Sequence, residues 1–179
     1  MIPSLFIGSE RADVIYWDFT DSLDVMMSYI PEICSYELLE AYLNIVDVLK
    51  QYYCLENIPA IRLSDTSYKM IQQEKLYLSG ESMGLAWMLG ILCKIKGKVF
   101  PTDLYAWGAI KPIRDGSYSL FPTSNTGKKI NLCCLHGKKK IMLHHAERIY
   151  KYRFSGDAVR FKSNLTEVIK TLEIMIDAY

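Results

Sequence analysis

Residues 80–93 read Gly-Glu-Ser-Met-Gly-Leu-Ala-Trp-Met-Leu-Gly-Ile-Leu-Cys, a serine between two glycines followed by a long apolar run. The strand-like residues 75–78 precede this run, so we expect a strand, a turn that carries Ser82, and then a buried helix. The two glycines allow a sharp bend and a close approach to a substrate. The first N–H groups of the helix can stabilise an oxyanion. Ser82 is therefore a candidate nucleophile, although the same pattern also arises where a helix packs closely on a sheet.

The composition excludes several classes of protein. Of the 179 residues, 50% are apolar and the net charge is +1, which argues against a disordered chain or a broad polyanion binder. Nucleotide-binding glycine motifs are missing, so we expect no ATPase and no cofactor. The near-zero net charge gives no reason to expect a nucleic-acid partner. We also expect no membrane association, because no apolar run is long enough to cross a bilayer. The five cysteines lack disulfide-scaffold spacing, and the amino terminus lacks a sorting-signal pattern, both of which favour the cytoplasm.

Strand-like and helix-like segments alternate along the chain. The predicted fold is an α+β domain of two layers, a mixed sheet packed with helices, that extends over residues 1–179 without a linker. Turns are expected at Asp21-Ser22 and at Asp115-Gly116, the second inside a hairpin. The expected strands are residues 14–19, 60–63, 98–100, 104–107, 118–121 and 139–143. The expected helices are residues 35–54, 85–97 and 128–136, and a last helix that begins near Ser163 or Asn164.

Lys129 is a candidate general base, about 47 residues after Ser82. A lysine can accept a proton from serine only when its amine is neutral, and its ordinary pKa is about 10.4. Burial that lowers this pKa by about 3 units costs roughly 4 kcal/mol, which a desolvated pocket can impose. Ile130, Leu132 and Cys133 could supply apolar walls. The alternative is that Lys128 and Lys129 are both solvated lysines near the start of a helix.

From Gly80 onward, the sequence resembles the proteolytic domain of the Lon family of Ser-Lys peptidases. The family's Gly-Pro-Ser-Ala-Gly corresponds to residues 80–84, and its Gly-Glu-Ile corresponds to Gly-Ala-Ile at 108–110. After a short insertion, Phe121-Pro122 corresponds to Leu-Pro, and the family's catalytic lysine aligns with Lys129. Residues 137–143 and 164–172 resemble the family's later strand and closing helix. Residues 80–179 therefore carry the motifs, while residues 1–79 are divergent and match only in the order of their elements.

The resemblance implies a serine peptidase in which Ser82 attacks a peptide carbonyl and Lys129 takes its proton. Gly80, Glu81, Met83, Trp107 and Thr126 would contribute the oxyanion hole or bind the protein or peptide substrate. The family also implies a homo-oligomer, and a chain without its own ATPase would work with a separate ATPase or sensor protein.

Several residues depart from the family pattern. Trp107 stands where the family has a threonine beside the lysine, and Ala109 replaces its strand glutamate. Ser79 replaces an acidic residue, and Ser124-Asn125 replaces a Gly-Gly loop. Ser79, Ser124 or Thr126 could orient the lysine amine in place of the missing threonine.

Two alternatives remain, the first favoured by Trp107 and Ala109 and the second by the resemblance of residues 78–84 to the nucleophile elbow of α/β-hydrolases. One is a Lon-like binding or assembly module without catalysis. The other is a small α/β-hydrolase in which Ser82 is the nucleophile, Asp103 or Asp115 the acid, and His144 or His145 the base.

Other chemistry-bearing residues give weaker signals. Cys133, Cys134, His136, His144 and His145 do not have common zinc spacings, so no metal site is expected. The basic run 138–140 could contact phosphate, but a solvated strand start explains it equally well.

Overall fold

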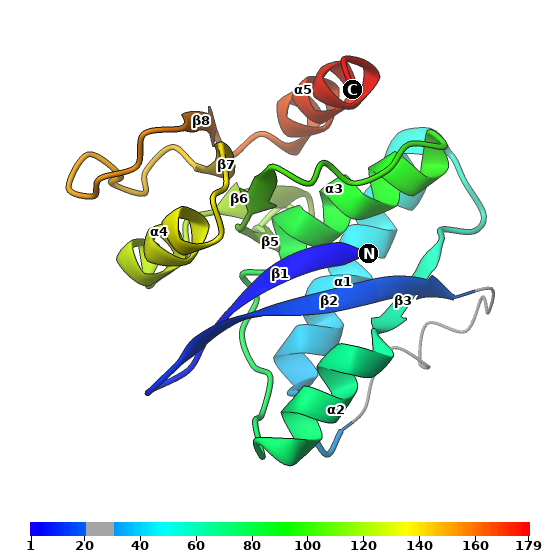
Figure 1. Ribbon diagram of the computed structural model, residues 1–179. Helices are drawn as coiled ribbons and strands as arrows, with labels where there is room; N and C mark the ends of the chain where they lie inside the picture. Colours follow the sequence, from blue (N-terminus) through cyan, green and yellow to red (C-terminus); the bar gives the residue numbers. More distant parts are fainter. Residues whose placement is uncertain (21–30) are drawn as a thin grey trace.

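The computed structural model describes residues 1–20 and 31–179 (Figure 1). An antiparallel sheet has the strand order β1-β2-β3, where β1 is Ile2–Ile7, β2 is Ala12–Thr20 and β3 is Ala60–Leu63. The strands expected at 14–19 and 60–63 are thus confirmed, whereas β1 was not expected. The turn expected at Asp21-Ser22 lies outside the described residues. Ile2 and Phe6 of β1 pack into the main core, and Leu5 packs into a second apolar cluster. Because both faces of β1 are buried, its sequence lacks the alternation of a half-exposed strand.

Helix α1 (Tyr36–Tyr53) confirms the first predicted helix and its cap. The Ser35 side chain accepts a hydrogen bond from the backbone N–H of Leu38, and Glu37 lies in the positively polarised first turn. The helix ends at Cys54, which adopts a left-handed conformation with φ of 51°. Its buried residues recur at helical spacing, as the sequence predicted.

The predicted strand at 75–78 is wrong. A helix that was not predicted, α2 (Asp65–Gln73), precedes this segment and is capped by Ser64. The chain then adopts a left-handed conformation at Lys75, with φ of 51°, which interrupts an extended run. Leu78 alone forms an isolated parallel bridge with Cys34. The turn that carries Ser82 is therefore fixed to the start of α1 rather than to a sheet.

Helix α3 (Gly84–Ile95) is the predicted apolar helix and lies at the centre of the molecule. Every residue from Gly84 to Cys93 is buried, because α1 and β1 both pack against it. Gly90 permits the closest of these approaches, since a Cβ at this position would lie 2.3 Å from Ile2 Cγ1. Because neighbouring elements cover α3 on all sides, the helix can be apolar on all sides.

The second half of the chain adds two small sheets. A parallel sheet has the order β4-β7-β8, where β4 is Leu104–Ala106, β7 is Lys140–His144 and β8 is Asp157–Phe161. A hairpin joins β5 (Ala109–Pro112) to β6 (Tyr118–Phe121) through the predicted Asp115-Gly116 turn. Helix α4 (Thr126–Leu135) connects β6 to β7. The expected strands at 104–107, 118–121 and 139–143 and the expected helix at 128–136 are confirmed, each with its ends placed within two residues of the prediction.

The predicted strand at 98–100 is also wrong, and β8 was not predicted. The segment after α3 closes the helix instead of pairing with a strand, because Lys98 N–H donates to Cys93 O at 2.7 Å. The described residues contain five helices, with antiparallel and parallel strands divided among three sheets. The α+β class is confirmed, while strands of both kinds occur in separate sheets rather than in one.

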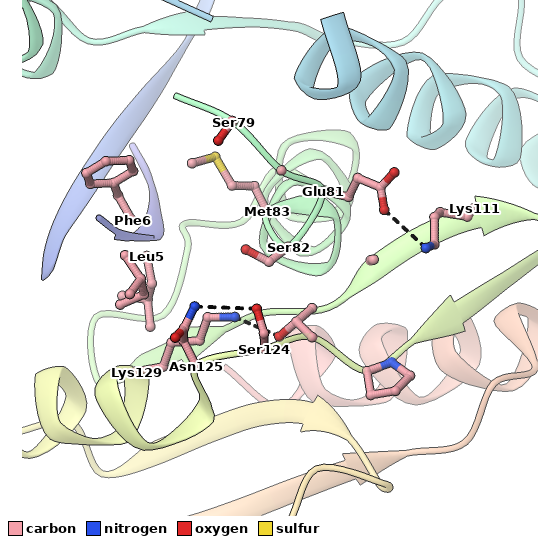
Figure 2. A pocket seen from close by; sticks show the side chains of 15 residues that line it. Leu5, Phe6, Ser79, Glu81, Ser82, Met83, Lys111, Ser124, Asn125 and Lys129 are labelled. Carbon is pink, nitrogen blue, oxygen red and sulfur yellow. Dashed lines mark hydrogen bonds and ion pairs between the residues drawn. The ribbon is translucent and has the colours of Figure 1, made fainter. Parts of the chain in front are cut away.

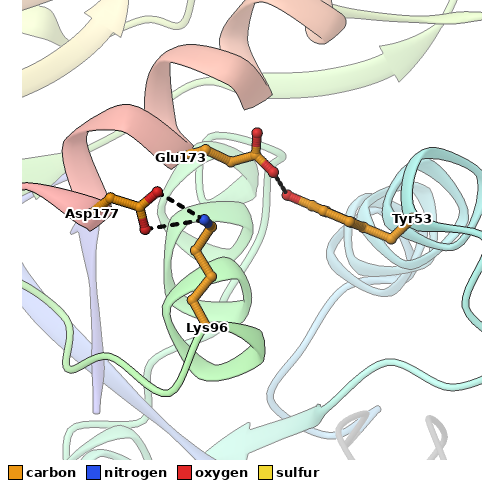
Figure 3. Close-up of polar contacts among 4 residues, drawn as sticks. All are labelled: Tyr53, Lys96, Glu173 and Asp177. Carbon is orange, nitrogen blue, oxygen red and sulfur yellow. Dashed lines mark hydrogen bonds and ion pairs between the residues drawn. The ribbon is translucent and has the colours of Figure 1, made fainter.

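Helix α5 (Leu165–Asp177) begins after Asn164, as predicted, and the Asn164 side chain accepts from the N–H of Glu167. Its apolar face joins the main core, and two polar contacts attach it to the neighbouring helices (Figure 3). Lys96 Nζ lies 3.1 Å from Asp177 Oδ1, and the Tyr53 hydroxyl donates to Glu173. Within residues 1–20 and 31–179, every helix is too short or too polar to traverse a membrane.

Candidate active site

The turn before α3 presents Ser82 at the amino-terminal end of the helix. Gly80 has φ of +92°, a conformation that glycine adopts without strain. The backbone after the turn is fixed to the segment between β4 and β5, since Gly108 N–H donates to Ser82 O at 2.9 Å and Leu85 N–H donates to Gly108 O at 3.0 Å. Ser82 is half-buried, so its side chain is held in place and remains accessible.

The N–H groups of Ser82 and Met83 precede the first turn of α3. Within the described part of the chain, neither group donates a backbone hydrogen bond. Unpaired N–H groups at a helix amino terminus attract negative charge, because they add to the positive end of the helix dipole. They can therefore serve as the oxyanion-binding groups that the sequence predicted for this turn.

A cavity of about 340 Å³ lies in front of Ser82 (Figure 2). Strand β1 contributes residues 5–7, the turn contributes 79–83, and the chain after β6 contributes 122–125. Ala109 and Lys111 of β5 and Lys129 of α4 complete the lining. The structure thus brings Ser82 and Lys129 to one cavity from separate helices.

Lys129 is buried one turn into α4, with 3% of its surface exposed. Burial lowers its pKa from 10.5 to about 8, against a smaller opposing effect of the Glu147 charge. Its Nζ donates to Thr123 Oγ1 at 2.6 Å and lies 5.8 Å from the centre of the Trp107 ring. Lys128, the next residue back, is exposed, so the two adjacent lysines have different environments.

Glu147 lies behind Lys129 and was not a candidate from the sequence. It is 4% exposed, and its Oε1 accepts from Trp107 Nε1 at 2.9 Å and from Thr126 Oγ1 at 2.8 Å. Thr123 supplies two further donors, its N–H to Oε2 at 3.2 Å and its hydroxyl to Oε1 at 3.4 Å. Glu147 and Thr123 lie in irregular segments, where no hydrophobic periodicity marks them in the sequence.

The remaining predicted site residues divide into two groups. Gly80, Glu81 and Met83 line the cavity. Trp107 and Thr126 do not line it, and instead hold Glu147 from behind. The hydroxyl that contacts the lysine amine comes from Thr123, not from Ser79, Ser124 or Thr126, the three that the sequence suggested.

An ion pair lies at the edge of the cavity. Glu81 Oε2 and Lys111 Nζ are 3.2 Å apart, and each side chain is more than a third exposed. A pair this exposed contributes little to stability, but it places one charge of each sign beside Ser82.

The residues nominated for an α/β-hydrolase triad do not reach this cavity. His144 is buried at the end of β7, where its Nε2 lies 2.9 Å from Ser163 Oγ and its Nδ1 accepts from the N–H of Ala146. Burial lowers the pKa of His144. His145 follows it in the same turn, Asp103 accepts from the Tyr179 hydroxyl, and Asp115 lies in the hairpin turn. None of these four residues contributes to the described lining around Ser82.

The nominated metal ligands are also dispersed. Cys133 is buried, while Cys134 is exposed on the same helix, and none of the five cysteines forms a disulfide. His136 Nδ1 lies 2.8 Å from the Tyr105 hydroxyl. Across the residues the structure describes, no group of three His, Cys, Asp or Glu side chains is placed to hold a metal ion.

The site combines a serine hydroxyl, a desolvated amine and two free N–H groups around one cavity. In the described residues Ser82 Oγ has no hydrogen-bond partner, and the amine donates to Thr123 instead. No protein-family model matches the chain, and no curated protein matches it. The function of the site is therefore inferred from its geometry and chemistry.

Proposed function

We propose that this chain is a serine peptidase of the Lon-like Ser-Lys type, in which Ser82 is the nucleophile and Lys129 the general base. The observation that carries the proposal is that Ser82 shares a cavity with a lysine whose pKa is lowered to about 8. Near neutral pH, a lysine with that pKa is neutral in roughly a tenth of molecules, about 300-fold more than at the ordinary pKa. Burial thus supplies a base that a solvated lysine would not provide.

The proposed reaction uses groups that line the cavity. Ser82 Oγ attacks the peptide carbonyl carbon as its proton passes to Lys129 Nζ. The N–H groups of Ser82 and Met83 hold the resulting oxyanion. Lys129 then gives the proton to the leaving amine as the C–N bond breaks, which leaves an acyl-enzyme. Water attacks the ester with Lys129 again as the base, and the acid product leaves Ser82 restored.

A protein or peptide is the proposed substrate. The resemblance to Lon peptidases favours this class, and the cavity combines apolar side chains of β1 and Met83 with the Glu81–Lys111 pair. The cavity is small relative to a folded protein, which favours an unfolded or flexible segment. We further propose a cytoplasmic enzyme whose own reaction is ATP-independent. It would form a homo-oligomer or receive substrates from a separate ATPase or sensor protein.

The test is covalent labelling of the folded protein with serine-directed phosphonylating and acylating reagents, followed by intact mass. We expect one adduct on wild type, none on Ser82→Ala and a strongly slowed adduct on Lys129→Ala. His144→Ala should label like wild type. Two matched controls, Lys128→Ala and Ser155→Ala, replace exposed residues outside the cavity and should also label normally. An adduct that requires His144 but not Lys129 would refute the dyad and favour the hydrolase alternative.

A binding or assembly module is the second candidate, because the Lys129 amine donates to Thr123 while Ser82 Oγ is unpaired among the described residues. In that case the cavity would hold a peptide without cleaving it. The labelling experiment separates the two, since a folded wild type that forms no adduct, alone or with a partner, favours binding without chemistry.

A further inference from the structure

Glu147 is a buried carboxylate that the proposed reaction does not use. Four donor groups converge on it from three residues: the Trp107 indole, the Thr126 hydroxyl, and the N–H and hydroxyl of Thr123. The indole and the backbone N–H can only donate. This arrangement suits an ionised carboxylate, which accepts hydrogen bonds and donates none. Burying a carboxylate carries a desolvation cost, which these four donors offset, so the charge is held at one fixed position.

We propose that Glu147 is a positioning residue for Lys129: it holds the proton of the Thr123 hydroxyl, so that Thr123 accepts from the amine and the nitrogen lone pair is left for Ser82. This inference rests on the proposed function, because it assigns a role within the same Ser82–Lys129 site.

The argument depends on the single proton of the Thr123 hydroxyl. A hydroxyl has one donor and two acceptor lone pairs. Thr123 Oγ1 lies 2.6 Å from Lys129 Nζ and 3.4 Å from Glu147 Oε1, so its proton can be directed to either neighbour. When Lys129 is neutral, a hydroxyl that donated to the amine would occupy the lone pair required for catalysis. The negative charge of Glu147 favours the other orientation, in which the amine keeps its lone pair free.

The charge of Glu147 also acts on Lys129 directly. It raises the pKa of Lys129 and so opposes the larger lowering caused by burial. It has the same sign of effect on the pKa of His144 at the end of β7. Removing the charge of Glu147 should therefore lower the pKa of Lys129 and that of His144. The titration of Lys129 must be followed at its own resonance, so that it is not confused with that of His144.

Other charged groups lie near Glu147 and Lys129. Arg160 of β8 donates to the carbonyl oxygens of His145 and Glu147, and the Glu81–Lys111 pair lies across the cavity. These groups are unchanged in the variants below, so their contribution is common to all of them. Of the charged or titratable side chains, His144 interacts electrostatically with Glu147, Arg160 contacts the Glu147 backbone, and Glu81 and Lys111 line the same cavity as Lys129.

The test is Glu147→Gln, which keeps the size of the side chain and removes its charge. The pKa of Lys129 is followed by NMR of lysine-labelled protein, with the resonance assigned by its loss in Lys129→Met. The rate of Ser82 labelling is measured across the same pH range. We expect the pKa of Lys129 to fall below about 8, the acidic limb of the rate profile to move to lower pH with it, and the plateau rate to drop about tenfold. Glu56→Gln, at an exposed position, is the charge-matched control and should change neither.

A double-mutant cycle with Thr123→Val isolates the role of the hydroxyl proton. Without a hydroxyl there is no proton to misdirect, so Glu147→Gln should not lower the plateau rate further in the Thr123→Val background. Additive losses in the two variants would overturn the inference.

The outcomes separate this inference from the proposed function. A wild type that labels at Ser82, with a Glu147→Gln variant that shifts neither the pKa nor the rate, refutes the role of Glu147 and leaves the dyad in place. A Lys129 resonance that shifts in Glu147→Gln, in a protein that never labels at Ser82, refutes the peptidase and retains the coupling between Glu147 and Lys129.

Discussion

Because Lys129 is buried, replacing it by methionine should change how the stability of the protein depends on pH. The pKa of this lysine is 10.5 when solvated and about 8 in the folded protein. Between these two values the unfolded chain binds more protons than the folded chain, so stability rises with pH. Below about 8 both states are protonated and the full cost of burying the charge remains. Methionine has a similar length and no charge, so Lys129→Met removes this cost and its pH dependence.

The size of the effect follows from the pKa difference. A shift of this size corresponds to about 3 kcal/mol at 1.36 kcal/mol for each unit. We therefore expect the wild type to gain about 3 kcal/mol relative to Lys129→Met between about pH 7 and about pH 10.5. The variant also loses the hydrogen bond to Thr123. The part of its energy that depends on the charge of Lys129 is already contained in the folded pKa, and the remainder is the same at every pH, so it cancels in the comparison.

The assay is urea unfolding of both proteins at several pH values, followed by circular dichroism. Lys128→Met is the matched control, because the same substitution at the exposed neighbour should give no such pH-dependent difference. Equal pH dependence in wild type and Lys129→Met would refute the reasoning. It would show that Lys129 is solvated and remove the base from the proposed dyad.

Two further predictions concern the packing around α3 and α5. Tyr53→Phe removes the hydroxyl that donates to Glu173, a charge-assisted bond, and should lower the free energy of unfolding by about 1–2 kcal/mol in urea titrations. An unchanged free energy would show that this contact does not stabilise α5. Gly90→Ala places a Cβ 2.3 Å from Ile2 Cγ1 and should cost about 1–3 kcal/mol by displacing β1. Adding Ile2→Ala should then cost less than it does in wild type, and equal costs in both backgrounds would contradict the clash.

The long helices were predictable because their signals are local. Ser35 and Asn164 cap α1 and α5 as the sequence indicated, and the apolar run after Gly84 forms α3. A helix of several turns repeats its pattern often enough to be recognised from spacing alone. Ser82 and Lys129 were also chosen from the sequence, from a glycine turn and an alignment of motifs. The structure places both at one cavity.

Local sequence signals were enough to identify the main helices and to select Ser82 and Lys129 as candidates for chemistry. The surroundings of these two residues depend on how distant segments pack together. It buried β1 on both faces, converted the expected strand at 75–78 into irregular chain, and assembled Glu147 and Thr123 around Lys129. The physical reason is that a pKa, a cavity and a hydrogen-bond network depend on contacts between residues far apart in the chain. Those contacts leave no repeating pattern in the sequence. Each loop has to bring only one side chain to one position, whereas a helix repeats its apolar residues at every turn.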